Sequence, residues 1–130
     1  MNEGRATLVR FRLERARETF AEAEMLAHPG HWNGCLNRLY YACFYAVNAL
    51  LLSQGLSSAK HAGVRDLFNK HFVRTGAVSQ EGGEFYNELF RSRLRGDYDE
   101  VTRFDEPTVR PWIDRARGFV SEIERLLGSI

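Results

Sequence analysis

The sequence predicts an all-α protein, an up-and-down bundle of four to five helices. Apolar residues recur at helical spacing in long segments, which short turns containing glycine or proline separate. No segment rich in Val, Ile and Thr with alternating polarity competes with these helices. Because short connections favour antiparallel neighbours, we expect residues 1–130 to form a single helical domain.

The first predicted helix covers about residues 5–27. Its apolar side chains follow alternating steps of four and three residues and form one continuous stripe: Val9, Leu13, Ala16, Phe20, Ala23 and Ala27. The His-Pro-Gly-His segment at 28–31 ends this helix, because proline and glycine both break helices.

The second predicted helix begins at Trp32 or Asn33 and ends near Ser53. Its segment 37–52, NRLYYACFYAVNALLL, is apolar on almost every side. Such a helix lies either at the centre of a core or in a membrane. Since a span needs ~20 apolar residues, we expect a buried central helix and no membrane segment.

Two shorter helices follow. A cap at Ser57 or Ser58 is expected to open the third helix, which ends before Gly76. Ser79 opens the fourth, which we expect to end near residue 94. A Gly-Gly pair weakens the first turn of this fourth helix.

The last predicted helix follows a loop at residues 96–105, which show no clear period. Pro107 suits the first turn of this helix, because backbone N–H groups in the first turn have no partner within the helix and the one that proline lacks is not missed. Pro111 can instead mark the start, with Thr108 as the cap, and the sequence leaves both alternatives open.

Composition and cysteine spacing narrow the function classes. The net charge is +1, so a site for nucleic acid must be a local basic patch. Cys35 and Cys43 lie about 12 Å apart along one helix, beyond the ~7 Å that a disulfide spans. The charged N-terminal segment lacks the apolar stretch of a signal peptide. We therefore expect reduced thiols and a cytoplasmic protein.

The histidines do not predict a metal site. His28 and His31 flank a turn, while His61 and His71 are ten residues apart, so no pair has the i, i+4 spacing of a helical zinc site. Glycine-rich phosphate loops are also absent. We expect no metal and no cofactor.

The segment 91–100, RSRLRGDYDE, is the first candidate site. Arg93 lies on or beside the apolar face of the fourth helix, and Asp97 follows one turn later. A guanidinium held by a carboxylate on a dry face can clamp a phosphate with its planar fork of donors. The alternative is a structural ion pair that ties the helix end to the loop. Arg91 and Arg95 are expected to form a solvated basic rim.

The second candidate is the polar edge of the central helix. Asn37, Arg38 and Tyr41 lie near its start and are expected to line a cleft. Tyr45 and Asn48 lie further along, where hydrogen bonding within the core is the simpler interpretation.

His61 opens the third predicted helix. The positive end of a helix lowers the pKa of an imidazole, and a neutral imidazole can serve as a general base. The alternative is a hydrogen-bonded surface residue without a catalytic role.

Four stretches together resemble the HEPN family, the higher eukaryote and prokaryote nucleotide-binding domain: CLNRLYYACFYAVNALL, KHAGVRDLF, FVRTG and RLRGDYD. The resemblance covers nearly the whole chain and is closest to the small stand-alone prokaryotic branch. It implies a helical bundle, often homodimeric, encoded beside a minimal nucleotidyltransferase in toxin–antitoxin pairs. Active members are metal-independent RNases with an Arg, four to six residues and a His. The Arg binds the scissile phosphate and the His moves protons.

This sequence departs from that motif at the histidine. The arginine carries over to Arg93, but Tyr98 stands where the histidine is expected, preceded by Asp97. Unperturbed pKa values of ~10 for tyrosine and ~3.9 for aspartate suit neither to replace an imidazole. His61 can substitute only if the start of the third helix folds against Arg93.

The resemblance therefore predicts a module that binds a nucleotide or RNA, acting with a nucleotidyltransferase partner and as a homodimer. Arg93 is the expected phosphate contact, and Asp97 and Tyr98 orient it. The enzymatic alternative is an RNase that uses Arg93 with His61 or Tyr98, and a further alternative is a purely structural partner subunit.

Overall fold

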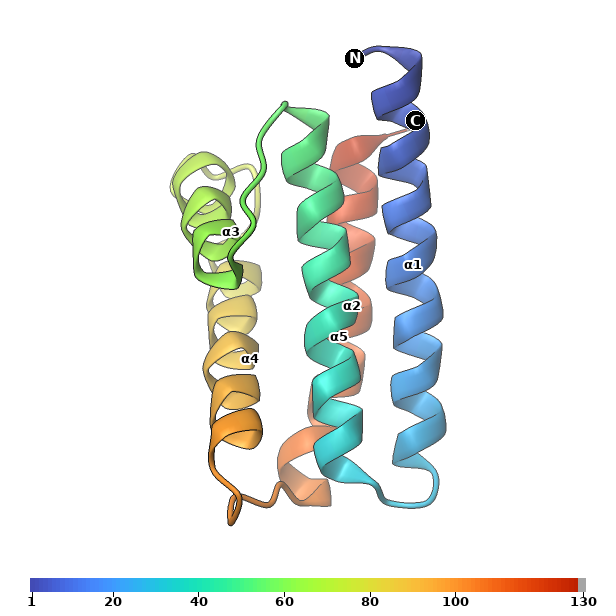
Figure 1. The fold of residues 1–130 in the computed structure, drawn as a ribbon, viewed down its shortest axis with the longest axis vertical. Coiled ribbons are helices and arrows are strands. Elements are labelled where there is room, and N and C mark those ends of the chain that lie inside the picture. Colours follow the sequence, from blue (N-terminus) through green and yellow to red (C-terminus); the bar gives the residue numbers. More distant parts are fainter. Residues whose placement is uncertain (129–130) are drawn as a thin grey trace.

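The computed structural model describes residues 1–128, which form an up-and-down helical bundle (Figure 1). Its elements are α1 (Glu3–Ala27), α2 (Trp32–Ser53), α3 (His61–Phe68), the π-helix η1 (Asn69–Val73), α4 (Gln80–Tyr98) and α5 (Glu106–Leu127). No strand occurs in residues 1–128. The predicted all-α class is confirmed.

Helix α2 is the centre of the bundle. It contacts α1, α3, α4 and α5, and Figure 1 shows it between α1 and α4 with α5 behind it. Contacts on three sides explain why almost every face of this helix is apolar. Asn48 is only half-buried, and its side-chain amide donates to the backbone carbonyl of Phe44 at 2.8 Å. The residue is thus satisfied within its own helix.

The third helix is not capped by Ser57 or Ser58, in contrast to the prediction. It starts at His61, and the Ser58 hydroxyl accepts from the Lys60 backbone N–H at 3.2 Å in the turn before it. Residues 69–73 then continue the chain as a π-helix. Gly76 follows with a φ of 83°, a left-handed conformation that favours glycine.

Helix α4 continues past its predicted end and includes Tyr98. Arg93 and Asp97 therefore lie on successive turns of one helix. The glycines of its first turn are buried, and a Cβ at Gly83 would lie 2.7 Å from a Val73 methyl. Glycine here permits η1 to pack closely against α4, so the pair serves packing between elements.

The observed start of α5 distinguishes the two alternatives that the sequence left open. Its N-cap is Asp105, whose carboxylate accepts from the Thr108 backbone N–H at 3.1 Å. Pro107 lies in the first turn and Pro111 inside the helix. The start at Pro107 is therefore right, and Thr108 is not the cap.

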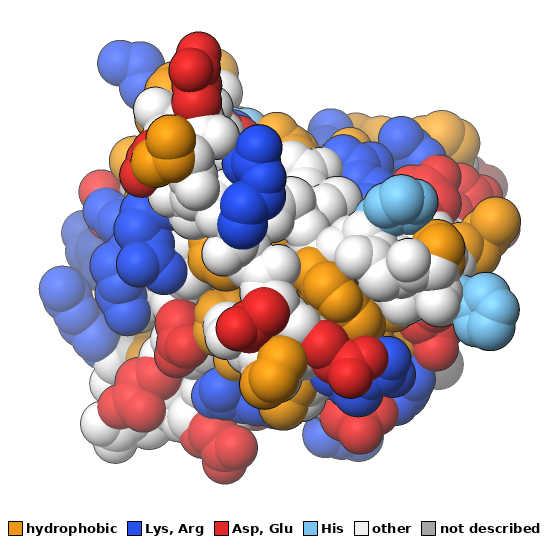
Figure 2. Space-filling view, turned by 90° about the horizontal axis from the view of Figure 1, so that it is seen from below, with side chains coloured by type: hydrophobic (Ala, Val, Ile, Leu, Met, Phe, Trp, Pro, Cys, Tyr) orange, Lys and Arg blue, Asp and Glu red, His pale blue; other side chains and the backbone are white. Residues whose placement is uncertain are grey.

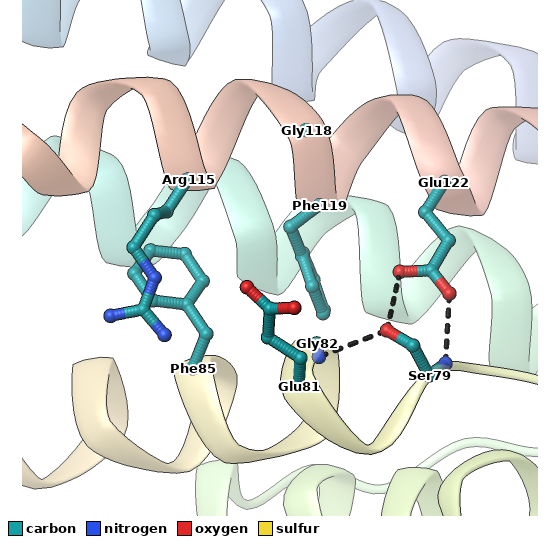
Figure 3. A pocket seen from close by; sticks show the side chains of 8 residues that line it. All are labelled: Ser79, Glu81, Gly82, Phe85, Arg115, Gly118, Phe119 and Glu122. Atoms are coloured by element: carbon teal, nitrogen blue, oxygen red, sulfur yellow. Dashed lines mark hydrogen bonds between the residues drawn. The ribbon is translucent and has the colours of Figure 1, made fainter.

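Glu122 joins the start of α4 to α5 (Figure 3). Its carboxylate accepts from the Ser79 backbone N–H at 2.8 Å and bonds the Ser79 hydroxyl at 3.1 Å. That hydroxyl in turn accepts from the Gly82 N–H at 3.0 Å. A carboxylate of the chain itself thus occupies the positive end of α4. The pocket beside Glu122 lies where these contacts hold α4 and α5 together, so we assign it a structural role.

Across the described part of the chain, no helix combines the length and the apolar character that crossing a membrane requires.

Candidate functional site

Arg93 is held in a fixed position on α4. Its side chain is 12% exposed, and its Nε lies 2.8 Å from Asp97 Oδ2. The Nε–H is not aligned for a hydrogen bond, so the contact is an ion pair. The guanidinium carbon also lies 5.2 Å from the Tyr40 ring centroid and 5.6 Å from that of Tyr41. A carboxylate and two aromatic faces together fix this cation.

Arg93 and Asn37 line the same pocket, of about 220 Å³. The pocket lies between the start of α2, the end of α4 and the loop before α5. Its walls are Asn33, Gly34, Leu36, Asn37, Arg93, Gly96, Asp97 and Phe104. The structure thus brings together two residues that lie far apart in the sequence and were predicted for one cleft.

Asn33 closes this pocket by holding the loop that precedes α5. Its amide nitrogen donates to the Thr102 carbonyl at 3.1 Å, and its amide oxygen accepts from the Phe104 N–H at 2.8 Å. Both bonds satisfy backbone groups that no helix satisfies. Asn33 and Phe104 were not predicted as site residues.

His61 belongs to the aromatic cluster that surrounds Tyr40. The Tyr40 hydroxyl and His61 Nδ1 are 2.8 Å apart, which is a hydrogen bond. The imidazole stacks on Phe44 with ring centroids 4.3 Å apart. Tyr40 therefore contacts both His61 and Arg93. The start of α3 thus packs against the same tyrosine as Arg93, which brings His61 into the neighbourhood of the arginine.

The environment lowers the pKa of His61 below its ordinary value. The larger cause is burial, and the second is the positive charge of Arg93, while Asp97 acts in the opposite direction. The predicted direction is right, but its main cause is burial rather than the helix end. Burial also raises the pKa of the Tyr40 hydroxyl to about 12, so this hydroxyl keeps its proton.

The lowered pKa predicts a stability that falls in mild acid. Below the ordinary histidine value of 6.5 the unfolded chain binds a proton at His61 that the folded chain does not yet bind. Stability should therefore decrease as the pH falls through that value. Urea unfolding at about pH 7.5 and pH 5.5 should show a larger decrease for the wild type than for His61→Gln. Equal decreases would contradict the assignment.

Arg38 and Tyr41 lie next to the pocket rather than in its wall. The Arg38 guanidinium donates to Asn37 Oδ1 at 2.8 Å and lies 5.1 Å from the Tyr41 ring centroid. It also lies 3.5 Å from a carboxylate oxygen of Glu22. The predicted group is therefore contiguous, with Asn37 on the pocket side and Arg38 on the α1 side.

The remaining predicted residues lie outside the pocket. Arg91 and Arg95 are exposed, as expected of a basic rim, and the Arg95 guanidinium lies 5.8 Å from the Phe104 ring centroid. Tyr98 is 80% exposed at the end of α4. It does not line the pocket, whereas Asp97 does.

Figure 2 views the end of the bundle that carries the α1–α2 and α4–α5 connections. Lysine and arginine side chains gather along its left edge, the side of α4 in Figure 1, and acidic side chains are interspersed elsewhere. Residues 1–128 contain no group of three or more His, Cys, Asp or Glu that could hold a metal ion.

The candidate site offers the fixed guanidinium of Arg93, the side-chain amide of Asn37 and the aromatic ring of Phe104. These groups suit a phosphate-bearing ligand.

Comparisons with known proteins give the family. The HEPN domain model matches residues 9–126. A UPF0332 protein of Thermotoga maritima is 45% identical, over 98% of this chain and 96% of its own. A protein of Methanocaldococcus jannaschii named "Putative toxin MJ0605" is 31% identical, over 91% of this chain and 87% of its own.

A solved structure supports the fold. The crystal structure of TT1696 from Thermus thermophilus aligns with a TM-score of 0.77 at 18% identity, covering 91% of this chain and 97% of that one. At this identity the likeness concerns the fold alone. The match of the domain model to most of the helical bundle decides the family, and the chain belongs to the HEPN domain family.

Proposed function

We propose that this HEPN protein binds a nucleotide or RNA through Arg93. The observation that carries the proposal is the fixed guanidinium beside the pocket that Asn37 and Phe104 also line. Its single ion pair among the described residues is with Asp97, whose side chain is 36% exposed. The ion pair uses the Nε of Arg93, so a phosphate can join the carboxylate at the other nitrogens of the guanidinium.

The protein acts together with a nucleotidyltransferase partner in a toxin–antitoxin-like pair, in the cytoplasm, and as a homodimer. The relative whose name is "Putative toxin MJ0605" supports the toxin-like context. Apolar side chains exposed on α1 and α5, namely Leu8, Met25 and Leu126, supply surface for association. Sedimentation of the purified chain, alone and with the nucleotidyltransferase, measures both associations.

The test of binding uses ATP, GTP and a single-stranded RNA of about 12 nucleotides. We expect saturable binding of at least one of them. Because Tyr40 links His61 to Arg93, ligand at the pocket should shift the imidazole resonances of His61. His71 is exposed and serves as the internal control. Binding that leaves the His61 resonances unchanged, or no binding at all, would contradict the proposal.

The second candidate function is a metal-independent RNase that uses Arg93 and His61. The contact of Tyr40 with both residues favours His61 over the exposed Tyr98 as the proton-transferring group. With the Tyr40 hydroxyl as donor to Nδ1, a neutral imidazole carries its proton on Nε2 and presents a donor to the ligand. If the imidazole instead donates from Nδ1 to the tyrosine oxygen, Nε2 is unprotonated and can act as a base, so the tautomer of His61 separates the two functions. Cleavage of RNA in EDTA that His61→Ala abolishes would favour the RNase instead.

A purely structural partner subunit makes a different prediction. Such a chain would associate with the nucleotidyltransferase and bind neither nucleotides nor RNA. The binding assay therefore separates it from both other functions.

A further inference from the structure

We propose that two copies of this chain associate through the outer face of α1, with the two α1 helices antiparallel and related by a two-fold axis at the level of residues 16 and 17. This inference rests on the proposed function, because it assigns the surface and the register of the homodimer proposed there.

Helix α1 carries a second stripe of residues beside the stripe that it buries. This outer stripe recurs at alternating steps of three and four residues, which is the spacing of positions a and d in a coiled-coil heptad. Its members are Leu8, Phe11, Arg15, Glu18, Glu22 and Met25. Side chains at this spacing lie along one line of the helix, so a single partner helix can contact all six.

The outer stripe exposes large apolar side chains at both of its ends. Leu8, Phe11 and Met25 are 41%, 63% and 73% exposed. Figure 1 shows α1 at the edge of the bundle, with the other labelled helices all to one side of it. Exposed apolar side chains gathered on one helix face mark a surface for association.

The middle of the outer stripe is charged and complementary to itself. Arg15 Nη1 lies 3.7 Å from Glu18 Oε2 in the same helix, and both side chains are partly exposed. Such solvent-exposed ion pairs contribute little free energy. Arg15 and Glu18 can therefore each take a further partner of opposite charge from a second copy.

A single antiparallel register pairs all six positions. The outer stripe is symmetric about the point between residues 16 and 17, so a two-fold axis there maps the stripe onto itself. The facing pairs are Leu8 with Met25, Phe11 with Glu22, and Arg15 with Glu18, one member from each copy. Apolar side chains then meet at the two ends, and an arginine meets a glutamate on each side of the axis. The carboxylate of Glu22 is turned to Arg38 of its own chain, which leaves its methylene groups for Phe11.

The charge distribution of α1 favours the antiparallel orientation. Five arginines lie within residues 5–17 and four glutamates within residues 14–24. Antiparallel copies place the basic half of one helix against the acidic half of the other, whereas parallel copies place like charges together. The charged pairs beside the axis also fix the register, as polar residues at core positions of a coiled coil do.

The antiparallel arrangement keeps the two Arg93 pockets apart. The pocket includes residues of the first turns of α2, so it lies near the C-terminal end of α1. In the proposed dimer these ends of the two α1 helices point in opposite directions. Each pocket is then complete within one chain, and we expect one ligand per chain without cooperativity.

The test is a charge-reversal cycle, followed by sedimentation at about 1–200 µM protein. In Arg15→Glu or Glu18→Arg the four side chains beside the axis carry like charges, so the dissociation constant of the dimer should rise at least about tenfold. An equimolar mixture of the two variants should form a heterodimer, which also shows that both are folded. The chain with both exchanges should dimerise again. Arg10→Glu is the matched control, because Arg10 is exposed on α1 outside the outer stripe.

A cross-link measures the register directly. Leu8→Cys and Met25→Cys variants are mixed and treated with a short bis-maleimide, and the products are identified by mass spectrometry. The native Cys35 and Cys43 are buried and should not react. We expect a product that joins one variant to the other. Products that join each variant only to itself would overturn the antiparallel register.

The outcomes separate this inference from the proposed function. A wild-type dimer that both charge reversals leave unchanged would overturn the α1 surface and leave the homodimer standing. A monomeric wild type that still binds RNA or a nucleotide through Arg93 would overturn the homodimer together with this inference, but not the binding function. If Glu18→Arg instead abolishes association with the nucleotidyltransferase, that partner covers the outer stripe. Loss of ligand affinity in folded Glu18→Arg would show that the pocket needs the second copy, and would overturn the antiparallel arrangement.

Discussion

Exchange of Arg93 for glutamine is expected to weaken RNA or nucleotide binding by about ten- to hundredfold. A charge-assisted hydrogen bond contributes about 1.5–3 kcal/mol, and the guanidinium is already fixed by Asp97 and two tyrosine rings. Little ordering entropy is therefore lost on binding. Fluorescence anisotropy at several salt concentrations measures the effect. For a single strand, each lost phosphate contact should reduce the salt slope by about 0.7.

Arg115 offers a matched control for this exchange. Its guanidinium carbon also stacks on an aromatic ring, 4.5 Å from the Phe85 centroid, but it lies in the hollow between α4 and α5 (Figure 3). Arg115→Gln should leave the affinity and the salt slope unchanged. Equal losses of affinity in both variants would show that ligand binding does not depend on Arg93 in particular.

Replacement of Tyr40 by alanine is expected to lower the free energy of unfolding by about 3–5 kcal/mol. The residue is fully buried and packs against Phe44, Tyr86 and Phe90 as well as His61. Its removal leaves a cavity at the centre of the bundle and also takes away the ring beneath Arg93. Urea unfolding at neutral pH measures the change.

Tyr40→Phe separates the hydroxyl from the ring. It keeps the packing and removes the hydrogen bond to His61, so we expect a loss of about 1 kcal/mol. The free imidazole should also reorient, which the NMR resonances of His61 would report. If the phenylalanine variant is as unstable as the alanine variant, packing of the ring does not account for the role of Tyr40.

The fold was predictable because its information is local. The apolar stripe of α1 and the all-round apolar character of α2 each follow from spacing within one segment, and the structure confirms both. The errors fall at helix ends, where the pattern is weakest. Residues 96–98 show no apolar period, yet they continue α4, and Ser58 caps the turn before α3 instead of the helix.

The candidate site was predictable only in part, because its residues meet through contacts between distant segments. Arg93 and Asp97 are one helical turn apart, so their pairing follows from spacing. Asn33 and the Thr102 carbonyl are 69 residues apart, and nothing in either segment indicates that they meet. The same holds for Tyr40 and His61, which are 21 residues apart across a turn. Such contacts depend on how helices dock.

The Asn33 contact has a consequence for the order in which the molecule folds. Helices α1 and α2 are neighbours in the chain and can pair early. The contact of Asn33 with Thr102 and Phe104 forms only when two segments about 70 residues apart in the sequence come together, which costs more chain entropy. We therefore expect the wall around Arg93 to be among the last parts to form. A ligand bound there would select fully folded molecules and raise their population by mass action. Occupancy of the pocket would thus report on completed folding as well as on recognition.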